Sequence, residues 1–505
     1  MKDTVVIGAG LAGLATAWQL RDRDVLVLES GGRVGGRLRS EVRGGHVMNW
    51  GAHMFAGAGT ATEALLHETR TGSVTIPGSL SALSMNGKLL RRGPVQSYPF
   101  RIPMSLPDRI ALLRTGARVS AEVLRYAARS RPRPGESAED RQQRILDFRD
   151  DRSFAEYTGE LPDDADALFR PTVSRSAAEP HQLSAGAGIG YFSLVWNIGQ
   201  GLDRSILGGP STLTGNIAAA LGERILLEAE AYEVTQHGEH VRVRYSHGGQ
   251  DREVTARTVV LATPAPVSHR IGVDLPADIR EALSRIRYGS YVSAAFLTAE
   301  AGPQRWDDTY AIAAPKRSFS VVMNMGNIER ATEARPSPGP DSAPGPDSAP
   351  DPDGAPGPGG LRRPDGASDP DGAPGPDGAP GPGGVGRPGG SLMVFSPAAL
   401  ADRLIDQDDE TILATYTRDL EQVLPGVGDL IVEARVQRWR TGAPYCFPGR
   451  ARIQPTLTRP SGRVLLAGDY LGTLYTETAI TTARTAAQRA AALLSPAPVR
   501  ELRAG

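Results

Sequence analysis

A glycine-rich loop between two apolar runs is the feature that most constrains the fold of this chain. The loop, Gly8-Ala9-Gly10-Leu11-Ala12-Gly13, follows the apolar residues 4–7 and leads into an alanine- and leucine-rich stretch over residues 11–20. The first run is typical of a short buried strand, the stretch after the loop predicts a helix, and residues 25–28 predict a second buried strand. The N-terminus therefore predicts a compact β-α-β unit.

The spacing of the glycines indicates what such a unit can bind. Gly8 permits a tight turn, Gly10 lets the backbone approach a pyrophosphate, and Gly13 lets the helix pack close to the sheet. The free N–H groups of Leu11 and Ala12, at the positive end of the helix dipole, would face the phosphates. We therefore expect a dinucleotide at this loop.

The residues after the second strand narrow the choice of dinucleotide. Glu29 and Ser30 follow this strand, and Glu29 lies 16 residues beyond Gly13. A carboxylate at this place can accept hydrogen bonds from ribose hydroxyls, and it would repel a 2′-phosphate. The pattern argues against NADP and leaves NAD and FAD open.

The next segment favours FAD. Residues 29–37 read Glu-Ser-Gly-Gly-Arg-Val-Gly-Gly-Arg. This resembles the Glu-x-x-x-Arg-x-Gly-Gly-Arg signature of the flavin-containing amine oxidase superfamily, which includes protoporphyrinogen oxidases and carotenoid-type desaturases. The resemblance implies an FAD site that contains Glu29, Arg33, Gly35, Gly36 and Arg37. Arg37 could neutralise the pyrophosphate, and the paired glycines could let the backbone approach the cofactor.

Two further segments carry the same resemblance. Residues 49–55 look like the family segment that runs beside the flavin ring, with Gly51 and Ala52 small enough for the ring to lie against the backbone. His53 in this segment is a candidate catalytic residue, or it could fill a polar gap. Residues 224–234 look like the strand pair that covers the adenine, where Ala231 would offer its backbone to the adenine edge.

The C-terminal region resembles the second flavin motif of the family. In residues 464–469 a strand would end at Gly468, and Asp469 could bond the ribityl chain or the pyrophosphate side. Residues 475–480 resemble the start of the last helix. A backbone N–H near Thr476 or Glu477 would there point at the flavin pyrimidine and stabilise negative charge on it. The site residues implied in this segment are Thr476, Glu477 and Ala479, with Tyr475 as an aromatic candidate beside the substrate.

One position separates this chain from the usual amine oxidases of the superfamily. Those enzymes place a lysine near the flavin N5 in a segment like Gly-Ser-x-x-Lys, and the matching segment here, residues 289–293, ends in Ser293. The three lysines of the chain, Lys2, Lys88 and Lys316, lie elsewhere. The resemblance therefore favours a protoporphyrinogen-oxidase-like or desaturase-like member. Residues 171–185 resemble a substrate-domain segment of the same branch.

The chain has a single cysteine, Cys446. Some amine oxidases tether FAD through a cysteine several residues before a Pro-Gly pair, but Cys446 precedes Pro448 by only two positions. We therefore expect non-covalent FAD. One cysteine also excludes an internal disulfide, and we expect no metal site.

Composition excludes several other classes of function. The net charge is −1 over 505 residues, so no overall field favours nucleic acid. We expect no transmembrane helix, because apolar stretches of about 20 residues are absent from the sequence. We expect a cytoplasmic protein. The helix predicted over 106–129 has an apolar face, comprising Ile110, Leu113, Val119, Val123 and Tyr126. Packing within the domain is the favoured reading of this face, and peripheral membrane contact is the alternative.

We predict an α/β fold with two domains. A Rossmann-type FAD-binding domain would be discontinuous, formed by residues 1–55, 201–280 and 430–505, and an α+β substrate domain would combine 56–200 with 281–429. Residues 334–390 repeat Pro-Asp-Gly-Ala-Pro-like units with few residues that could build a core, which predicts a disordered insertion.

The favoured function is FAD-dependent removal of a hydride from a hydrophobic small molecule, by desaturation or C–N oxidation, with O₂ as the expected electron acceptor and a biosynthetic role as one setting. Amine oxidation with release of H₂O₂ is one alternative, and a redox-neutral flavin isomerase or mutase is another. A non-catalytic protein with a relic dinucleotide site is disfavoured, because a relic would not need Arg37 and Asp469 at both ends of the chain.

Overall fold

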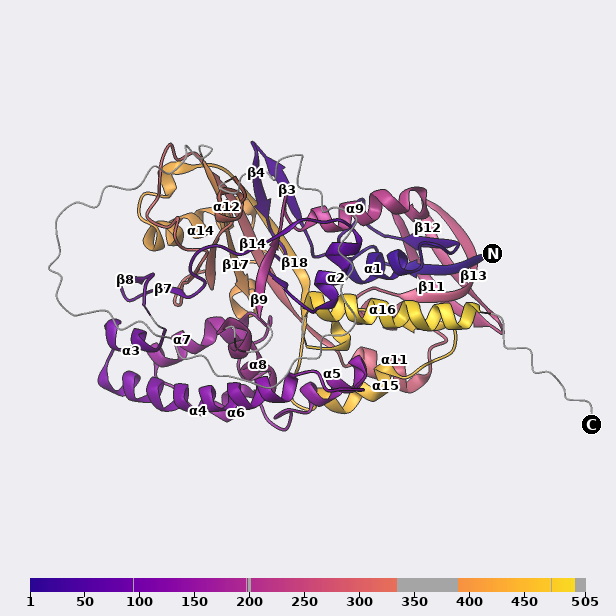
Figure 1. The fold of residues 1–505 in the computed structure, drawn as a ribbon, viewed down its shortest axis with the longest axis horizontal. Helices are drawn as coiled ribbons and strands as arrows, with labels where there is room; N and C mark the ends of the chain where they lie inside the picture. Colours follow the sequence, from indigo (N-terminus) through magenta and orange to yellow (C-terminus); the bar gives the residue numbers. More distant parts are fainter. Residues whose placement is uncertain (94, 197, 199–200, 334–388, 474, 496–505) are drawn as a thin grey trace, which may run out of the picture.

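The computed structural model describes residues 1–93, 95–196, 198, 201–333, 389–473 and 475–495. Most of the predicted insertion, 334–388, lies outside the described residues. Its last predicted residue, Gly390, instead begins a strand of the second sheet. Two seven-stranded sheets form the framework of the described chain, and helices cover their outer faces (Figure 1).

The first sheet contains the predicted β-α-β unit. Its parallel strands run in the order β10-β2-β1-β13, with β19 beside β13, and an antiparallel meander of β11, β12 and β13 extends it. The bounds are β1 Lys2–Ile7, β2 Val25–Leu28, β10 Ile225–Leu226, β11 Ala229–His237, β12 His240–His247, β13 Gln250–Leu261 and β19 Val464–Leu466. The strands predicted over 4–7 and 25–28 are confirmed, and so is the helix between them, α1 (Leu11–Gln19).

Three helices cover one face of this sheet. α1, α9 (Ser211–Leu221) and α16 (Tyr475–Leu494) share one apolar core with the buried side chains of Val6 and Val260. The first and last helices of the chain therefore lie side by side (Figure 1). This packing brings the two ends of the sequence, which carry the two predicted flavin motifs, to the same place.

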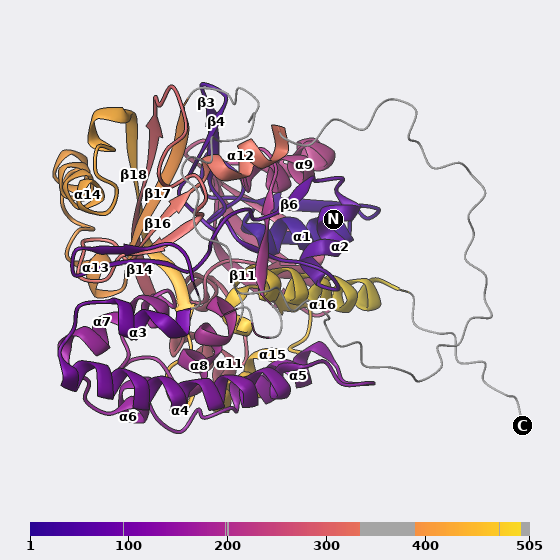
Figure 2. The same cartoon turned by 60° about the vertical axis from the view of Figure 1, so that its left-hand side comes forward.

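The second sheet has the order β18-β14-β17-β16-β15-β7-β8. The bounds are β7 Ala82–Met85, β8 Lys88–Leu90, β14 Arg287–Thr298, β15 Ala311–Ala313, β16 Val321–Asn324, β17 Gly390–Pro397 and β18 Ile431–Tyr445. α14 (Asp409–Val423) packs on its outer face (Figure 2). β18, which the predicted division at residue 430 assigns to the FAD-binding domain, pairs along its length with β14.

Helices from residues 98 to 195 form the helical part of the predicted substrate domain. They are α3 Tyr98–Arg101, α4 Leu106–Ser130, α5 Ala138–Leu146, α6 Phe154–Thr158, α7 Asp163–Ser174 and α8 Ala185–Val195. Residues 153–169 form two helices instead of one, because Gly159 ends α6 at φ 74° and Pro162 caps the start of α7. Residues 399–423 are likewise divided into α13 (Ala399–Asp402) and α14, which Asp408 caps.

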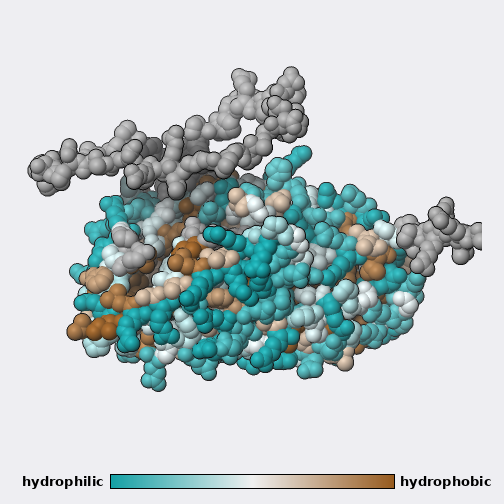
Figure 3. All heavy atoms as spheres, turned by 60° about the horizontal axis from the view of Figure 1, so that its bottom comes forward, coloured by the Kyte–Doolittle hydropathy of each residue, from teal (hydrophilic) through white to brown (hydrophobic). Residues whose placement is uncertain are grey.

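The apolar face predicted for α4 is only partly correct. Val119 and Val123 are buried, whereas Ile110 and Leu113 are 49% and 40% exposed. Figure 3 shows hydrophobic side chains gathered at the end of the molecule where α3 and α4 begin, and Phe100 and Leu106 are among the exposed apolar residues there. In the described ranges, none of the helices is long and apolar enough to cross a membrane.

The remaining elements belong to neither of the two large sheets. They are β3 Ser40–Arg43, β4 His46–Asn49, β5 Phe55–Ala56, α2 Ala61–Glu68, β6 Ser73–Thr75, β9 Leu202–Ile206, α10 Ala265–Ile271, α11 Ala277–Ser284, α12 Gly326–Glu333 and α15 Gln454–Thr458.

Candidate cofactor and active site

A cavity of about 680 Å³ runs from the glycine loop to the second sheet. Its lining contains nearly all of the residues that the sequence assigns to FAD: Gly8, Gly10, Leu11, Ala12, Glu29, Ser30, Arg33, Gly35, Gly36, Arg37, Gly51, Ala52, His53, Ala231, Gly468, Asp469, Thr476, Glu477 and Ala479. Gly13 is the exception among the glycines of the loop. Tyr475 begins α16, but its side chain lies outside the described residues.

The first sheet places these residues together because its parallel strands end at the cavity. β1 leads into Gly8, β2 into Glu29, β13 into Ala262, and β19 into the segment of Gly468. Ligands of open parallel sheets bind outside the carboxyl ends of the strands. Motifs that are hundreds of residues apart in sequence therefore meet at one edge.

The glycines of the loop have two different structural roles. A Cβ added at Gly13 would lie 1.8 Å from the Gly8 carbonyl oxygen, so α1 can approach the loop only without a side chain there. A Cβ added at Gly10 would have no heavy atom within 4 Å, and Gly10 lines the cavity. Gly13 therefore serves the packing of the loop, and Gly10 leaves space that a phosphate could fill.

Glu29 already holds the loop before any ribose binds. Its carboxylate accepts hydrogen bonds from the Ala9 N–H at 2.7 Å and from the Gly31 N–H at 2.9 Å. A carboxylate has about four lone-pair sites, so two bonds leave capacity for hydroxyl donors. The predicted role toward a ribose is therefore compatible with the structural role that the sequence did not reveal.

Arg37 and Asp469 pair with each other across the site. The guanidinium donates two hydrogen bonds to the carboxylate, at 2.7 and 2.9 Å, and a third to the Gly442 carbonyl at 3.1 Å. Asp469 is only 7% exposed. The sequence assigned each residue separately to the cofactor, and it carried no signal for this pair, because the partners are 432 positions apart.

Gly51 has a packing reason to be glycine in addition to the one predicted. The sequence reading reserves this position for contact with the flavin ring. In the structure a Cβ at Gly51 would lie 2.1 Å from the Arg37 carbonyl oxygen. The close approach of two backbone segments therefore suffices to require glycine, although Gly51 also lines the cavity.

The start of α16 is tied to α2 by the Glu477 side chain. Its carboxylate accepts from the Ala61 N–H at 2.8 Å, the Thr62 N–H at 3.0 Å and the Thr62 hydroxyl at 2.6 Å. These bonds satisfy free N–H groups at the start of α2. The prediction concerned the backbone N–H near Thr476 or Glu477, and both residues line the cavity.

His53 is a neutral imidazole with one defined tautomer. Its Nδ1 lies 3.1 Å from the Gly51 carbonyl oxygen, which can only accept, so Nδ1 carries the proton and Nε2 presents a lone pair. Burial, together with the nearby charge of Arg175, lowers the pKa of His53 to about 4. A ring held in this way can accept a hydrogen bond inside the cavity, but it cannot retain a proton at neutral pH.

Ser293 lies in the cavity wall at the position where the resemblance would place a lysine. Its hydroxyl donates to the Trp50 carbonyl at 2.8 Å and lies 3.3 Å from the Trp439 indole nitrogen, which can donate to it. Ser293 is 1% exposed. The position therefore presents a satisfied neutral hydroxyl in place of an ammonium.

Cys446 also lines the cavity, which the spacing argument did not anticipate. Burial raises the pKa of its thiol to about 11. The protonated thiol is a poor nucleophile, because the thiolate is the reactive form.

The sequence analysis missed most of the cavity wall on the substrate side. Arg175, Tyr291, Phe395 and Trp439 line this part, from α7 and the second sheet. Tyr291 and Phe395 form an edge-to-face pair with ring centres 5.9 Å apart. Alternation along a strand could have indicated inward side chains, but only the pairing of the strands shows which face meets the flavin site.

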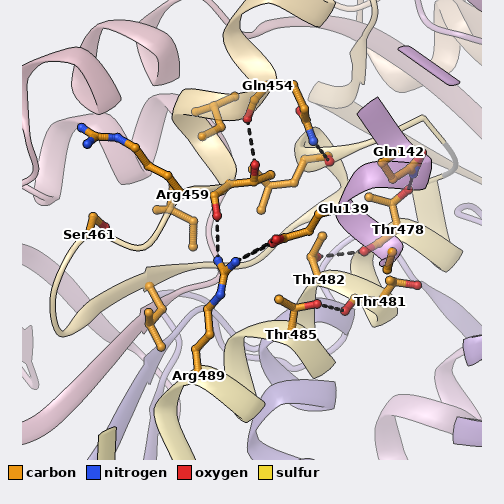
Figure 4. A pocket seen from close by; sticks show the side chains of 16 residues that line it. Glu139, Gln142, Gln454, Arg459, Ser461, Thr478, Thr481, Thr482, Thr485 and Arg489 are labelled. Carbon is orange, nitrogen blue, oxygen red and sulfur yellow. Dashed lines mark hydrogen bonds and ion pairs between the residues drawn. The ribbon is translucent and has the colours of Figure 1, made fainter. Parts of the chain in front are cut away.

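A second, smaller hollow of about 40 Å³ lies between α5, α15 and α16 (Figure 4). Arg489 crosses it with two bonds of 2.8 Å to Glu139 and one of 2.7 Å to the Thr458 carbonyl. Its principal charges are therefore paired. Among the described residues, no group of three or more His, Cys, Asp or Glu side chains is arranged to hold a metal ion.

The residues present fit the FAD that the sequence analysis predicts. The open side of Gly10, the N-terminus of α1, the Glu29 carboxylate and the Arg37 guanidinium all line one continuous cavity. The family model "Flavin containing amine oxidoreductase" matches residues 11–343 and 356–494, and this family implies FAD.

Curated relatives agree with this assignment at low identity. Amine oxidase [flavin-containing] A from Equus caballus is 27% identical over 326 residues, which are 60% of this chain and 57% of that protein. Protoporphyrinogen oxidase 2, chloroplastic/mitochondrial, from Arabidopsis thaliana is 41% identical over 69 residues, 13% of this chain and 14% of that protein. The chain therefore matches little more than half the length of the amine oxidase.

The fold matches solved structures over nearly its whole length. A putrescine oxidase structure with bound putrescine superposes with a TM-score of 0.70, 20% identity, and coverage of 98% of this chain and 99% of that one. Together, the match of the family model over most of the sequence and the FAD-compatible cavity establish that the chain belongs to the flavin-containing amine oxidoreductase family.

Proposed function

We propose that this protein is an FAD-dependent oxidoreductase that removes a hydride from a hydrophobic small molecule. The observation that carries the proposal is one continuous cavity that joins the FAD motifs to the apolar face of the second sheet. On that side its lining includes Leu80, Met323, Met393 and Phe395. An apolar body bound there would lie next to the flavin site and out of bulk water.

The proposed reaction forms a double bond. The substrate loses a hydride, with two electrons, from one carbon and a proton from the neighbouring nitrogen or carbon, so that C=N or C=C is formed. When bound, FAD supplies the two-electron acceptor for the hydride. The residues of the chain hold and orient the substrate. O₂ is the proposed final acceptor, and with two electrons and two protons it would yield H₂O₂.

His53 is the proposed proton-accepting contact. Its Nε2 lone pair can accept a hydrogen bond from the substrate group that loses the proton, with Nδ1 fixed by the Gly51 carbonyl. Because burial lowers the pKa of His53 to about 4, the proton would pass on to solvent instead of remaining on the ring. Tyr475 stays a candidate from its position alone.

Ser293 supports a branch that does not use a lysine near the flavin. Its hydroxyl bonds to the Trp50 carbonyl and is buried. This arrangement favours the protoporphyrinogen-oxidase-like or desaturase-like reading. The curated amine oxidase relative favours the second candidate, oxidation of an amine by O₂.

The charge of the cavity bears on which amines are candidates. Its acidic lining residues all lie in, or shortly after, strands of the first sheet or in the helix α16 that covers it: Glu29, Glu230, Asp469 and Glu477. None of these carboxylates lies on the second sheet or on α7. The matched putrescine oxidase structure contains bound putrescine, which is a diamine. In the present cavity, the second ammonium of a diamine would find no described carboxylate on the wall formed by the second sheet and α7. We therefore expect a diamine to be a poor substrate.

Anaerobic reduction of the flavin tests the proposal. Purified yellow protein is mixed without oxygen with a panel of monoamines, diamines, tetrapyrrole precursors and polyenes, and bleaching of the flavin absorbance is followed. Bleaching by one class, with a product two mass units lighter, supports hydride removal. A product of unchanged mass that forms only with added reductant would select the isomerase or mutase. A protein that cannot take up FAD would contradict the proposal.

A further inference from the structure

Arg175 stands out among the cavity residues that neither the FAD motifs nor the proposed hydride transfer uses. It caps the C-terminal end of α7 and lines the cavity on the substrate side. Its backbone carbonyl accepts a hydrogen bond from the Tyr291 hydroxyl, which anchors this helix end to β14. The backbone of Arg175 is therefore held in a defined place beside the second sheet.

The guanidinium of Arg175 lacks the partner that a buried cation normally has. Its Nε is enclosed and has no hydrogen-bond partner among the described residues. The charged or titratable neighbours that act on it are Tyr191 and Tyr291, and no carboxylate is among them. Burial lowers the pKa of Arg175 to about 10, so it still carries its charge at neutral pH.

The other arginines near the cavity have counter-ions or carbonyl partners. Arg37 pairs with Asp469, and Arg33 donates to the carbonyls of Val34 and Gly36. Buried charges in folded proteins are usually paired, and leaving one unpaired costs stability. A cation kept without a counter-ion in a ligand cavity is accordingly suited to a ligand that brings the negative charge.

We propose that the substrate carries a carboxylate that pairs with Arg175, while its apolar body lies against the second sheet. This inference rests on the proposed function, because it describes the substrate of the same cavity. A guanidinium presents parallel N–H donors that match the two oxygens of a planar carboxylate. Neutral His53 adds no second positive charge beside Arg175.

Binding of simple aromatic probes to the holoenzyme tests this charge preference. Benzoate, its neutral isostere benzamide and the cation benzylamine are titrated separately, and perturbation of the flavin absorbance is measured at constant ionic strength. We expect benzoate to bind about 10- to 100-fold more tightly than benzamide, the range expected for hydrogen bonds to a charged group. Equal affinity for benzoate and benzamide would overturn the inference.

Variants then assign the preference to Arg175. Arg175→Gln should abolish the advantage of benzoate over benzamide. Arg175→Lys should keep part of it, because the positive charge remains while the two parallel N–H donors of the guanidinium are lost. Arg170→Gln is the matched control. Arg170 lies on the same helix and is not among the residues that line the cavity. It pairs with Asp166 and Glu179. An unchanged preference in Arg175→Gln, or an equal loss in Arg170→Gln, would contradict the assignment.

Two readouts separate this inference from the proposed function. The same titrations are followed by the shift in thermal unfolding temperature, which does not depend on the flavin colour. If the protein takes up no FAD, the proposed function fails, whatever benzoate does. If it takes up FAD but treats benzoate and benzamide alike, only the role of Arg175 fails.

Discussion

At the scale of single residues, the site contains an ion pair, a neutral histidine and an arginine that has no described carboxylate partner. Arg37 and Asp469 form a partly buried bidentate pair, whereas His53 is kept neutral beside Arg175, which has no carboxylate partner among the described residues. The first arrangement stabilises the junction of the two flavin motifs. Neutral His53 and Arg175 lie where the substrate is proposed to bind.

The neutrality of His53 predicts a pH-dependent stability. Burial holds its pKa near 4 in the folded chain, below the ordinary 6.5. Between these values the unfolded chain binds a proton that the folded chain does not, so the His53 contribution makes the free energy of unfolding rise with pH. We expect His53→Gln to lose less stability than the wild type between pH 7 and pH 4.5, as measured by urea denaturation.

The comparison of the two proteins isolates His53 from other titrating groups. Burial raises the pKa of Asp150 to about 6, which acts in the opposite direction over the same pH range. Asp150 is present in both proteins, so its effect cancels in the difference. Parallel curves of unfolding free energy against pH would show that His53 does not titrate in this way.

The Arg37–Asp469 pair predicts strong coupling between two distant positions. A double-mutant cycle with Arg37→Gln and Asp469→Asn should give a coupling free energy of about 1–3 kcal/mol in urea unfolding. The exposed pair Arg459–Asp278, with side chains 46% and 57% exposed, is the control. There the coupling should stay below about 1 kcal/mol, because water screens it. Equal coupling in both cycles would contradict the importance of burial.

At the scale of elements, Gly13 and Gly10 have different roles in the loop, one in packing and one in cofactor binding. A Cβ at position 13 meets the Gly8 carbonyl oxygen, whereas a Cβ at position 10 meets no atom within 4 Å. Gly13→Ala should therefore destabilise the fold by about 1–3 kcal/mol or more through overpacking. Gly10→Ala should cost under about 1 kcal/mol, as expected at a helix N-cap, yet weaken FAD binding. Thermal unfolding of the apoprotein and FAD titration measure the two effects separately.

The opposite pattern would revise the roles of the loop glycines. If Gly10→Ala bound FAD as tightly as the wild type, the pyrophosphate would not approach this position. If Gly13→Ala retained full stability, α1 would have room to move away from Gly8, and the close packing of the helix would not depend on glycine.

Local sequence patterns predicted some elements well and misjudged others for identifiable reasons. The first β-α-β unit is correct because apolar runs, glycines and helix start lie within 28 residues. Segments 153–169 and 399–423 have helical patterns overall, but Gly159 with Pro162, and Asp408, end one helix or start another. Short turn signals therefore outweighed the average composition of each segment.

At the scale of the whole molecule, long-range strand pairing set the limit of prediction. β7 pairs in parallel with β15, more than 220 positions later, and β18 pairs with β14 across the predicted domain boundary. No local pattern contains these pairings. The FAD motifs could be recognised because each is a short segment, whereas Arg175 and the wall of the second sheet could be placed at the site only by the fold.

Residues of both sheets line the cavity, so a ligand bound there should stabilise the whole described structure. We expect removal of FAD to lower the unfolding temperature, and added FAD at about 100 times its dissociation constant to restore about 2.7 kcal/mol. Because the cysteine is protonated and its spacing differs from the tethered pattern, acid precipitation should release the flavin into the supernatant. Cys446→Ser should remain yellow and respond to FAD like the wild type. A yellow pellet in the wild type but not in Cys446→Ser would show a covalent link and contradict non-covalent binding.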